Sequence, residues 1–367
     1  MRIGFVHNRE DIYCATRMRY FINKGHSVYS LSFFSKNPQK LQKNIYQIPL
    51  IYFPFKYSYL KRFIHLIEII YYVNKYKIDV LHIISIINGI YSICSIKTKI
   101  VLENMGSDVL ILPKVHPIYK KFYKIIYKLS DAVIQDSHVS KKAGILYGAP
   151  LQNNKVIDVG IDMKLFNSKI KYGKARKYLG ISQNEKMIFI SRGTGEIYNI
   201  DVIIKTISIV KKYYNNIKYV FCDMRGDFYR KFIDLILDND CFDNVIIAGK
   251  LNHNNQLPYF YTDSNIVLSV PSSDSSPFSV YESMACKTPV IISELPWYHK
   301  KFQKDIDMVV VPSRNVKILS DSIIKILNGQ TVINLNSAYN KVSKNINFEI
   351  ENFKLEKLYY KILDIRN

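Results

Sequence analysis

The sequence predicts an α/β protein built from two parallel sheets, and three observations carry this prediction. The chain has 367 residues, enough for about two domains that each bury their own core. Short apolar segments typical of buried strands alternate with helical segments along most of its length. Residues 264–293 follow the order strand, loop, helix, strand, which is the arrangement that binds ligands at the ends of parallel strands.

The strands follow one another as parallel sheets require. In the first half we expect them near residues 2–6, 27–33, 78–84, 99–103, 131–135 and 155–159. In the second half we expect them near residues 187–191, 217–222, 244–248, 265–270, 289–293 and 308–311. The tail between residues 345 and 363 has apolar residues at helical spacing and predicts a closing helix.

The charge of the chain is unusual, with 52 Lys and Arg against 30 Asp and Glu, a formal net charge of +22. A field of this sign attracts nucleotides, anionic lipids and nucleic acids alike. The chain is also rich in Ile, Asn and Tyr, a bias expected from an AT-rich genome, so charge alone does not choose a partner. No run of about 18 uncharged apolar residues occurs, and the start MRIGFVHN indicates a first strand rather than a signal peptide. We therefore expect a cytoplasmic protein.

Metal and disulfide chemistry find little support. The five cysteines are scattered singly, without a Cys-x-x-Cys pair or a His cluster, and most are expected to be small core residues. Two Asp-x-Asp sequences, at residues 238–240 and 305–307, have the form of a metal motif, but we expect both in solvated turns. The sequence predicts neither a metal nor another cofactor.

The segment PSSDSSPFSVYESMACKTPVII carries the most chemistry, because it places Asp274 and Glu282 on either side of a predicted helix start. Ser276 is expected to cap this helix, and Pro277 suits the first helical position, where its missing N–H costs nothing. Amides and the dipole at a helix start favour anions, and a carboxylate can accept from two vicinal hydroxyls. The segment therefore predicts an anion site with sugar-binding acids beside it.

This segment resembles the acidic motif of the family 4 glycosyltransferases (glycosyl transferases group 1), retaining enzymes of the GT-B fold. The motif is Glu, seven residues, Glu, then a helix of small residues and a Pro-Val strand, and here Asp274 stands in place of the first Glu. In the family, the acid matched by Glu282 binds the ribose of a sugar nucleotide. The acid matched by Asp274, with the amides after it, holds the transferred sugar.

The resemblance implies two Rossmann-like domains facing a cleft, with the C-terminal helix crossing back to the first. The sequence DVGIDMKLF, residues 158–166, resembles a family element found just before the second domain. It implies an acceptor domain at residues 1–165, joined by a helix at about 350–367, and a nucleotide-sugar-binding domain at 166–349. Residues 166–180, which are polar and basic, would form the linker.

Further residues match the donor site of the family. Arg192 corresponds to the arginine that contacts the donor diphosphate, a task suited to a permanently charged guanidinium. The family's lysine a few residues later is absent, and Lys250 is a candidate replacement. The resemblance implies catalytic roles for Asp274 and Arg192, and a donor site formed by Arg192, Gly193, Lys250, Asp274, Ser276, Phe278, Ser279 and Glu282.

Two features of the first half concern the acceptor side. Gly106 and Asp108 resemble a Gly-Ser-Asp loop near the cleft of some members, where Asp108 either touches the acceptor or positions the loop. The segment PIYKKFYKIIYKL predicts a basic amphipathic helix. It supports a peripheral contact of residues 114–128 with an anionic membrane, or else a core-facing helix with solvated lysines. The predicted apolar face consists of Ile118, Phe122, Ile125, Ile126 and Leu129.

The activity that the resemblance implies is a retaining, metal-independent hexosyltransferase. It would move sugar from a nucleotide sugar to a saccharide or lipid-linked acceptor, in bacterial surface polysaccharide, lipopolysaccharide or glycolipid synthesis, at the inner face of the cell membrane. No nucleic-acid partner is expected. Two alternatives stay open: a sugar-nucleotide epimerase, which can share the fold, and a basic protein without turnover that binds nucleic acid or anionic membrane.

Overall fold

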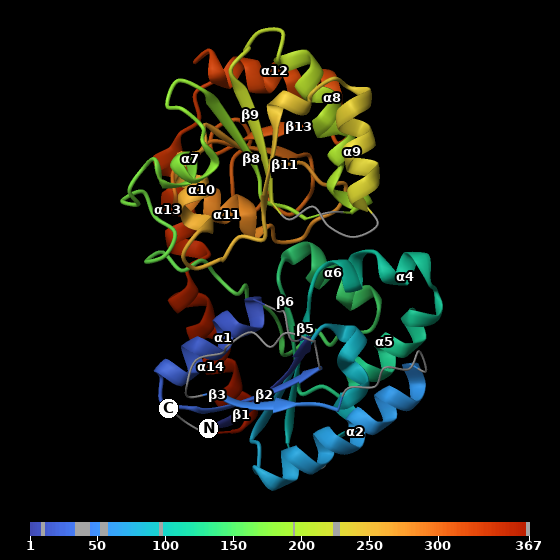
Figure 1. Cartoon of the computed structure of the whole chain (residues 1–367). Coiled ribbons are helices and arrows are strands. Elements are labelled where there is room, and N and C mark those ends of the chain that lie inside the picture. Colours follow the sequence, from blue (N-terminus) through green and yellow to red (C-terminus); the bar gives the residue numbers. More distant parts are fainter. Residues whose placement is uncertain are drawn as a thin grey trace. The chain divides into compact units, whose positions relative to one another are not determined.

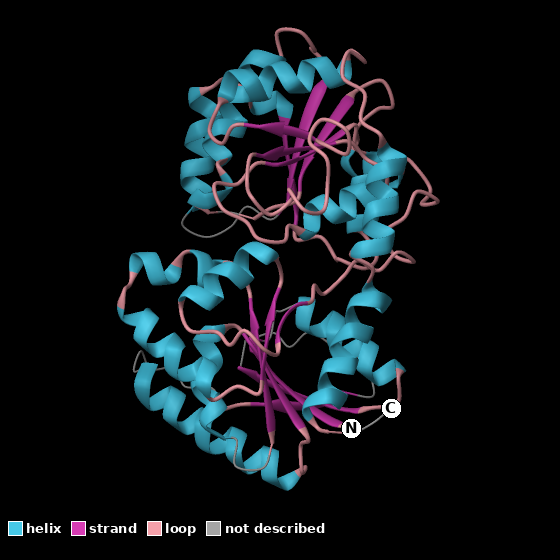
Figure 2. Cartoon of the chain, turned by 180° about the vertical axis from the view of Figure 1, so that it is seen from behind, coloured by secondary structure: helices cyan, strands magenta, loops and turns pink. Residues whose placement is uncertain are grey.

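The computed structural model describes residues 1–8, 12–33, 45–51, 58–94, 98–193, 195–222 and 228–364. The chain divides into two compact units. Unit 1 consists of Met1–Gly160 with Glu349–Asn367, and unit 2 of Ile161–Phe348. Each unit is a parallel sheet with helices on both faces (Figures 1 and 2).

The sheet of unit 1 has seven strands in the order β3-β2-β1-β4-β5-β6-β7. The strands are β1 (Arg2–Asn8), β2 (Ser27–Phe33), β3 (Ile45–Pro49), β4 (Val80–Ile84), β5 (Lys99–Asn104), β6 (Ala132–Gln135) and β7 (Asn154–Val156). The helices are α1 (Ile12–Asn23), α2 (Ser58–Lys75), η1 (Ile86–Cys94), α3 (Ser107–Leu110), α4 (Leu112–Val115), α5 (Ile118–Lys128), α6 (His138–Leu146) and α14 (Phe348–Ile362). The sequence did not predict β3, a short edge strand whose exposed residues interrupt the apolar pattern.

The sheet of unit 2 has six strands in the order β10-β9-β8-β11-β12-β13. The strands are β8 (Lys186–Ile190), β9 (Ile217–Cys222), β10 (Val245–Gly249), β11 (Ile266–Ser269), β12 (Val290–Ser293) and β13 (Val309–Val311). The helices are α7 (Lys174–Leu179), η2 (Glu196–Tyr198), α8 (Ile200–Val210), α9 (Phe228–Asp238), η3 (Phe242–Asn244), α10 (Leu257–Asp263), α11 (Phe278–Ala285), α12 (Val316–Leu327) and α13 (Leu335–Asn345).

Both faces of the unit 2 sheet are covered, which explains why its strands are continuous apolar runs. Along β8, Met187 and Phe189 enter one hydrophobic core, while Ile188 and Ile190 enter the other. Strand order reverses between β8 and β11, which are neighbours in the sheet although two strands separate them in sequence. In open α/β sheets, ligands bind outside the carboxyl ends of the strands at such a point.

The closing helix α14 belongs to unit 1, as predicted, and a buried polar network anchors it there. The Arg17 guanidinium on α1 donates to Glu103 Oε1 at 2.7 Å and to Asn352 Oδ1 on α14 at 3.2 Å. His82 Nε2 lies 2.9 Å from Glu103 Oε2, and His82 Nδ1 lies in hydrogen-bond contact with the Tyr359 hydroxyl on α14. These side chains are buried, so the network ties α1, β4, β5 and α14 into one core.

The predicted linker at residues 166–180 is wrong. Residues 174–179 form α7, which packs against α10 inside unit 2. The Asp263 carboxylate accepts hydrogen bonds from the backbone N–H groups of Gly173, Ala175 and Arg176 and so caps the start of α7. Arg176 is buried, and its guanidinium donates to the carbonyl oxygens of Ser182 and Glu185. The segment therefore forms a packed helix despite its basic composition.

The face of α5 also differs from the prediction. Tyr123, Ile126 and Tyr127 face the core, whereas Ile118 and Ile125 are exposed. The tyrosines replace the expected residues because their rings fill the core beside η1, and the Tyr123 hydroxyl donates to the Asp108 carbonyl at 2.5 Å. No helix of the described residues is long and apolar enough to cross a membrane.

The predictions about cysteines and acidic motifs have mixed outcomes. Cys14, Cys222, Cys241 and Cys286 are buried and form no disulfide, as expected of small core residues. Asp307 does not lie in a solvated turn: it is buried and accepts hydrogen bonds from Lys341 and Ser337 of α13. Within the described part of the chain, no group of three His, Cys, Asp or Glu side chains is arranged to hold a metal ion.

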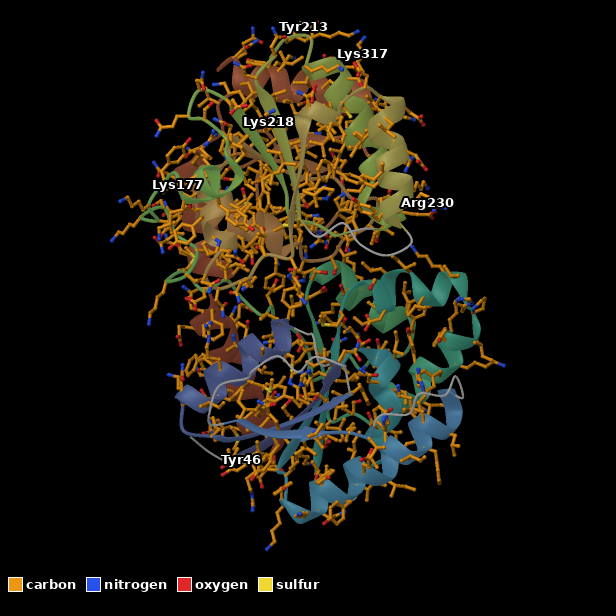
Figure 3. The ribbon with its side chains drawn as sticks, viewed as in Figure 1. Tyr46, Lys177, Tyr213, Lys218, Arg230 and Lys317 are labelled. Atoms are coloured by element: carbon orange, nitrogen blue, oxygen red, sulfur yellow. The ribbon has the colours of Figure 1, made fainter. Side chains whose placement is uncertain are left out.

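Apart from the buried Arg17 and Arg176, the basic residues that the structure describes lie at the surface of the two units. Unit 1 carries 27 basic and 13 acidic residues, and unit 2 carries 25 and 17. Figure 3 shows Lys177, Arg230 and Lys317 directed outward from α7, α9 and α12, with Tyr213 beyond the end of α8. Unit 1 is thus the more basic of the two.

Candidate functional site

Two loops at the carboxyl ends of β8 and β11 are joined by hydrogen bonds and form the floor of the candidate site. The Ser272 N–H donates to the Ile197 carbonyl at 2.7 Å. The Asn199 side chain donates to the Val270 carbonyl at 2.9 Å and accepts from the Ser272 hydroxyl at 2.8 Å. Because Asn199 also has a left-handed backbone (φ 50°), it both turns the first loop into α8 and fastens it to the second.

The predicted residues Arg192 and Asp274 meet in this place. Arg192 Nη2 donates to Asp274 Oδ2 at 2.5 Å, and both side chains are largely shielded from water. The Arg192 guanidinium also lies over the Tyr198 ring, 5.1 Å from its centroid. The second Asp274 oxygen accepts from the Ser275 N–H at 2.8 Å. The guanidinium is thus held in a fixed place at the strand ends, as recognition of an anionic group requires.

The start of α11 differs from the prediction by one residue. Ser276 is not the N-cap and Pro277 is not the first helical residue; Pro277 occupies the N-cap and Phe278 begins the helix. The reason is that the Ser276 hydroxyl is engaged elsewhere, donating to the Tyr281 hydroxyl at 3.1 Å. The first amides of the helix are therefore those of Phe278 and Ser279, the two that the resemblance assigns to the donor.

Glu282 lies in the middle of α11, buried, with each carboxylate oxygen bound by one side chain. The Tyr261 hydroxyl, on α10, donates to Oε2 at 2.7 Å and lies 3.0 Å from the Ser191 hydroxyl at the end of β8. His253 Nε2 bonds Oε1 at 2.7 Å, and the His253 ring packs edge-on against Phe166. Burial raises the pKa of Tyr261, so its hydroxyl keeps the proton it donates. The carboxylate orientation is fixed before any ligand arrives.

No sequence signal marks His253 or Tyr261 as partners of Glu282. Tyr261 belongs to an apolar helix and looks like any core residue there, while His253 stands among asparagines in a loop. Lys301 was missed as well. Its Nζ lies 3.3 Å from the Tyr281 hydroxyl, which places a cation near the start of α11.

Of the two remaining residues predicted for the donor site, Gly193 adjoins Arg192 and Lys250 lies farther away. Gly193 is exposed and directly follows Arg192 at the strand end. Lys250 is exposed and follows β10, two strands away from β8, which corresponds to about 10 Å across the sheet. The structure describes no hydrogen bond or ion pair that joins Lys250 to the other predicted donor residues, whereas Lys301 contacts α11 directly.

Gly106 and Asp108, which were predicted for the acceptor side, hold a loop in shape. Gly106 has φ 70° and precedes α3. The buried Asp108 carboxylate accepts from the Ser85 hydroxyl at 2.9 Å, the Ile86 N–H at 3.0 Å and the Met105 N–H at 3.0 Å. These bonds join the loops after β4 and β5, so they favour the second predicted role of Asp108, that of positioning the loop.

Asp108 also yields a prediction about pH. Burial raises its pKa from 3.8 to about 6, although the hydrogen bonds from Ile86 and Ser85 act in the opposite direction. The folded protein therefore binds a proton at the Asp108 carboxyl group more tightly than the unfolded chain does. The stability that this protonation contributes is complete below about pH 4 and is lost as the pH rises through about 6. The loss amounts to about 3 kcal/mol.

We therefore expect Asp108→Asn to destabilise the protein more at pH 4 than at pH 7, by a difference of about 3 kcal/mol. Urea unfolding of wild type and variant at the two pH values measures it. A difference that does not change with pH would contradict the shifted titration of Asp108.

Comparisons with known proteins agree with this fold. The family model for glycosyl transferases group 1 matches residues 173–346, and the model for glycosyl transferase 4-like proteins matches residues 2–137. A search of curated proteins by sequence finds no significant match.

Among solved structures, sucrose-phosphate synthase from Thermosynechococcus elongatus is similar with a TM-score of 0.85, at 16% identity and 99% coverage of both chains. HepE from Anabaena in complex with UDP-glucose has a TM-score of 0.81, at 14% identity, covering 98% of this chain and 100% of that one. The lipopolysaccharide outer core galactosyltransferase WaaB has a TM-score of 0.69, at 11% identity, covering 98% and 99%. At these identities the structural likeness establishes the fold.

Two parallel α/β units of this kind constitute the GT-B fold, which the chain shares with these solved structures. One family model matches most of unit 2 and the other most of unit 1, and both describe glycosyl transferases, so the chain falls in the class of glycosyltransferases.

Proposed function

We propose that this protein is a retaining glycosyltransferase that moves a sugar from a nucleotide-sugar donor to a saccharide or lipid-linked acceptor. The observation that carries the proposal is the arrangement around Glu282 in unit 2. A buried carboxylate with a fixed orientation, the Arg192–Asp274 pair and the start of α11 all lie at the carboxyl ends of β8 and β11, where strand order reverses.

Each group has a distinct task in this proposal. Glu282 accepts hydrogen bonds from the ribose hydroxyls, and Asp274 contacts the transferred sugar. When the bond between the sugar and the diphosphate breaks, the electron pair leaves with the diphosphate. Arg192 and the amides of Phe278 and Ser279 stabilise that charge. The acceptor oxygen forms the new bond to the anomeric carbon, and its proton passes to the leaving phosphate, so the reaction needs no side-chain base. The resemblance to the family implies that it also needs no metal.

Other features support a surface-polysaccharide or glycolipid role. HepE was solved in complex with UDP-glucose, WaaB is a lipopolysaccharide outer core galactosyltransferase, and both share this fold. Lys114, Lys120, Lys121, Lys124 and Lys128 are exposed, which suits a peripheral contact of residues 114–128 with anionic lipid at the inner face of the membrane. The family match favours the transferase over an epimerase or a binding protein without turnover.

The test is thermal melting of the protein with UDP-, GDP- and ADP-sugars. We expect one nucleotide class to stabilise the protein by about 2.7 kcal/mol at 100 times its dissociation constant, because ligand binding is coupled to folding. The responding base identifies the donor class. If no nucleotide sugar raises the melting temperature, while RNA or DNA binds with a steep dependence on salt, the binding-protein alternative replaces this proposal.

A further inference from the structure

Helix α2 carries an apolar face on its solvent side. Its inward side packs into the core of unit 1 through residues such as Ile69. Its outward side exposes Leu60 (60%), Phe63 (59%), Ile67 (52%) and Tyr71 (55%). These positions are three or four residues apart, so they form one stripe along the helix, which we call the α2 stripe.

The α2 stripe is unusual for a surface helix. Such a helix normally directs charged or polar side chains to water, and a helix that is apolar on all sides is expected to be buried. Ile70, also exposed, widens the stripe, and none of its members is charged. Figure 1 shows α2 on the outside of unit 1, with α5 on the same side of the sheet. The exposed stripe therefore indicates an interaction surface.

Basic residues surround the α2 stripe. Residues 58–77 contain four basic residues and one acid, Glu68, whose carboxylate is occupied by the Ile51 N–H at 3.1 and 3.2 Å. Helix α2 packs against η1, and η1 packs against α5. Residues 114–128 add five lysines and no acid, together with the exposed side chains of Ile118 and Ile125. Apolar side chains thus stand within a field of positive charge.

We propose that the α2 stripe inserts into the surface of an anionic membrane, with the flanking lysines binding the phosphates of the lipid headgroups. The proposal rests on the proposed function only for its purpose, which is to bring unit 1 to a lipid-linked acceptor. It adds an inserted apolar helix to the purely electrostatic contact of residues 114–128. The donor site in unit 2 has no part in it.

Charge favours a membrane over a second copy of the chain. Antiparallel pairing of two α2 helices would bring Lys75 and Lys77 of one copy toward Lys61 and Arg62 of the other, and like charges in contact are unfavourable. An anionic bilayer attracts the same four charges. The basic residues around the α2 stripe therefore favour anionic lipid as its partner.

The first experiment is co-sedimentation with vesicles of phosphatidylcholine, with and without phosphatidylglycerol. We expect the protein to bind the anionic vesicles, and Leu60→Ser/Phe63→Ser/Ile67→Ser to lower partitioning roughly tenfold or more, because three apolar side chains no longer leave water. The matched control is Leu237→Ser/Phe242→Ser/Val332→Ser, which removes three similarly exposed apolar side chains from unit 2. This control should partition like the wild type.

A second measurement reports insertion itself. The only native tryptophan, Trp297, is buried in unit 2, so Phe63→Trp adds a probe whose emission should shift to the blue with anionic vesicles alone. Equal partitioning of the wild type and the Leu60→Ser/Phe63→Ser/Ile67→Ser variant would overturn the proposal. So would a dimer in solution that this variant converts to monomer without vesicle binding. A donor-induced melting shift that persists in this variant shows that the donor site is intact and keeps the two proposals separate.

Discussion

Glu282→Ala is expected to abolish the melting shift caused by the nucleotide-sugar donor and to weaken donor binding roughly 100-fold or more. The substitution would remove the carboxylate that accepts two hydrogen bonds from the ribose hydroxyls, and hydrogen bonds to a charged group contribute about 1.5–3 kcal/mol each. Tyr261 and His253 already orient the two carboxylate oxygens of Glu282, so in the wild type the carboxylate is in place for the ribose before the donor binds. Differential scanning fluorimetry and isothermal calorimetry with the responding donor measure the effect.

Two controls separate this role from folding. Glu282→Gln keeps the volume and one acceptor oxygen, so it should retain more donor affinity than Glu282→Ala while still binding more weakly than the wild type. Glu185→Ala removes a glutamate at the amino end of β8, opposite to the candidate site, and should leave the donor shift intact. An unchanged shift in Glu282→Ala would remove this residue from the donor site.

Breaking the Arg17–Glu103 pair is expected to destabilise unit 1 by about 3–5 kcal/mol, because either single substitution leaves a buried charge without its partner. Arg17 is fully buried and Glu103 nearly so. Arg17→Met and Glu103→Gln should each show the loss in urea unfolding. The double variant should cost clearly less than the sum of the two, since it leaves neither charge behind. Additive losses would mean that the two charges do not stabilise each other.

The same pair gives the stability a dependence on acid. Burial opposes ionisation of Glu103, but the charge of Arg17 and the close approach of His82 outweigh it and lower the pKa of Glu103 from 4.5 to about 2. A lowered folded pKa means a contribution that is complete above about pH 4.5 and lost as the pH falls toward 2. Glu103→Gln should therefore unfold with a weaker pH dependence than the wild type across this range.

Much of the fold could be predicted because its signals are local. A strand buried on both sides of a parallel sheet is a continuous apolar run, and most of the strands other than β3 have this form. The helix over residues 278–285, with Asp274 before its start and Glu282 within it, could be found in the same way, since all lie in one short segment. The prediction of a linker at residues 166–180 failed because the buried Arg176 is indistinguishable in sequence from an exposed basic residue.

The contacts that give the candidate site its chemistry join residues far apart in the chain. Arg192 and Asp274 are 82 positions apart, and His253 is 29 positions from Glu282. Composition and spacing do not predict such pairs, because the pairs form only when parallel strands bring their carboxyl ends to one edge of a sheet.

The α/β class, the positions of most strands along the chain and the acidic segment with its helix could all be read from the amino-acid sequence, since each depends on neighbours along the chain. Three further features became visible only in the folded molecule: the partners that hold Glu282 and Arg192, the position of Pro277 directly before α11, and the apolar stripe exposed by α2. They could not be found earlier because burial and hydrogen bonding depend on what packs against a residue, and packing is settled only when distant segments meet.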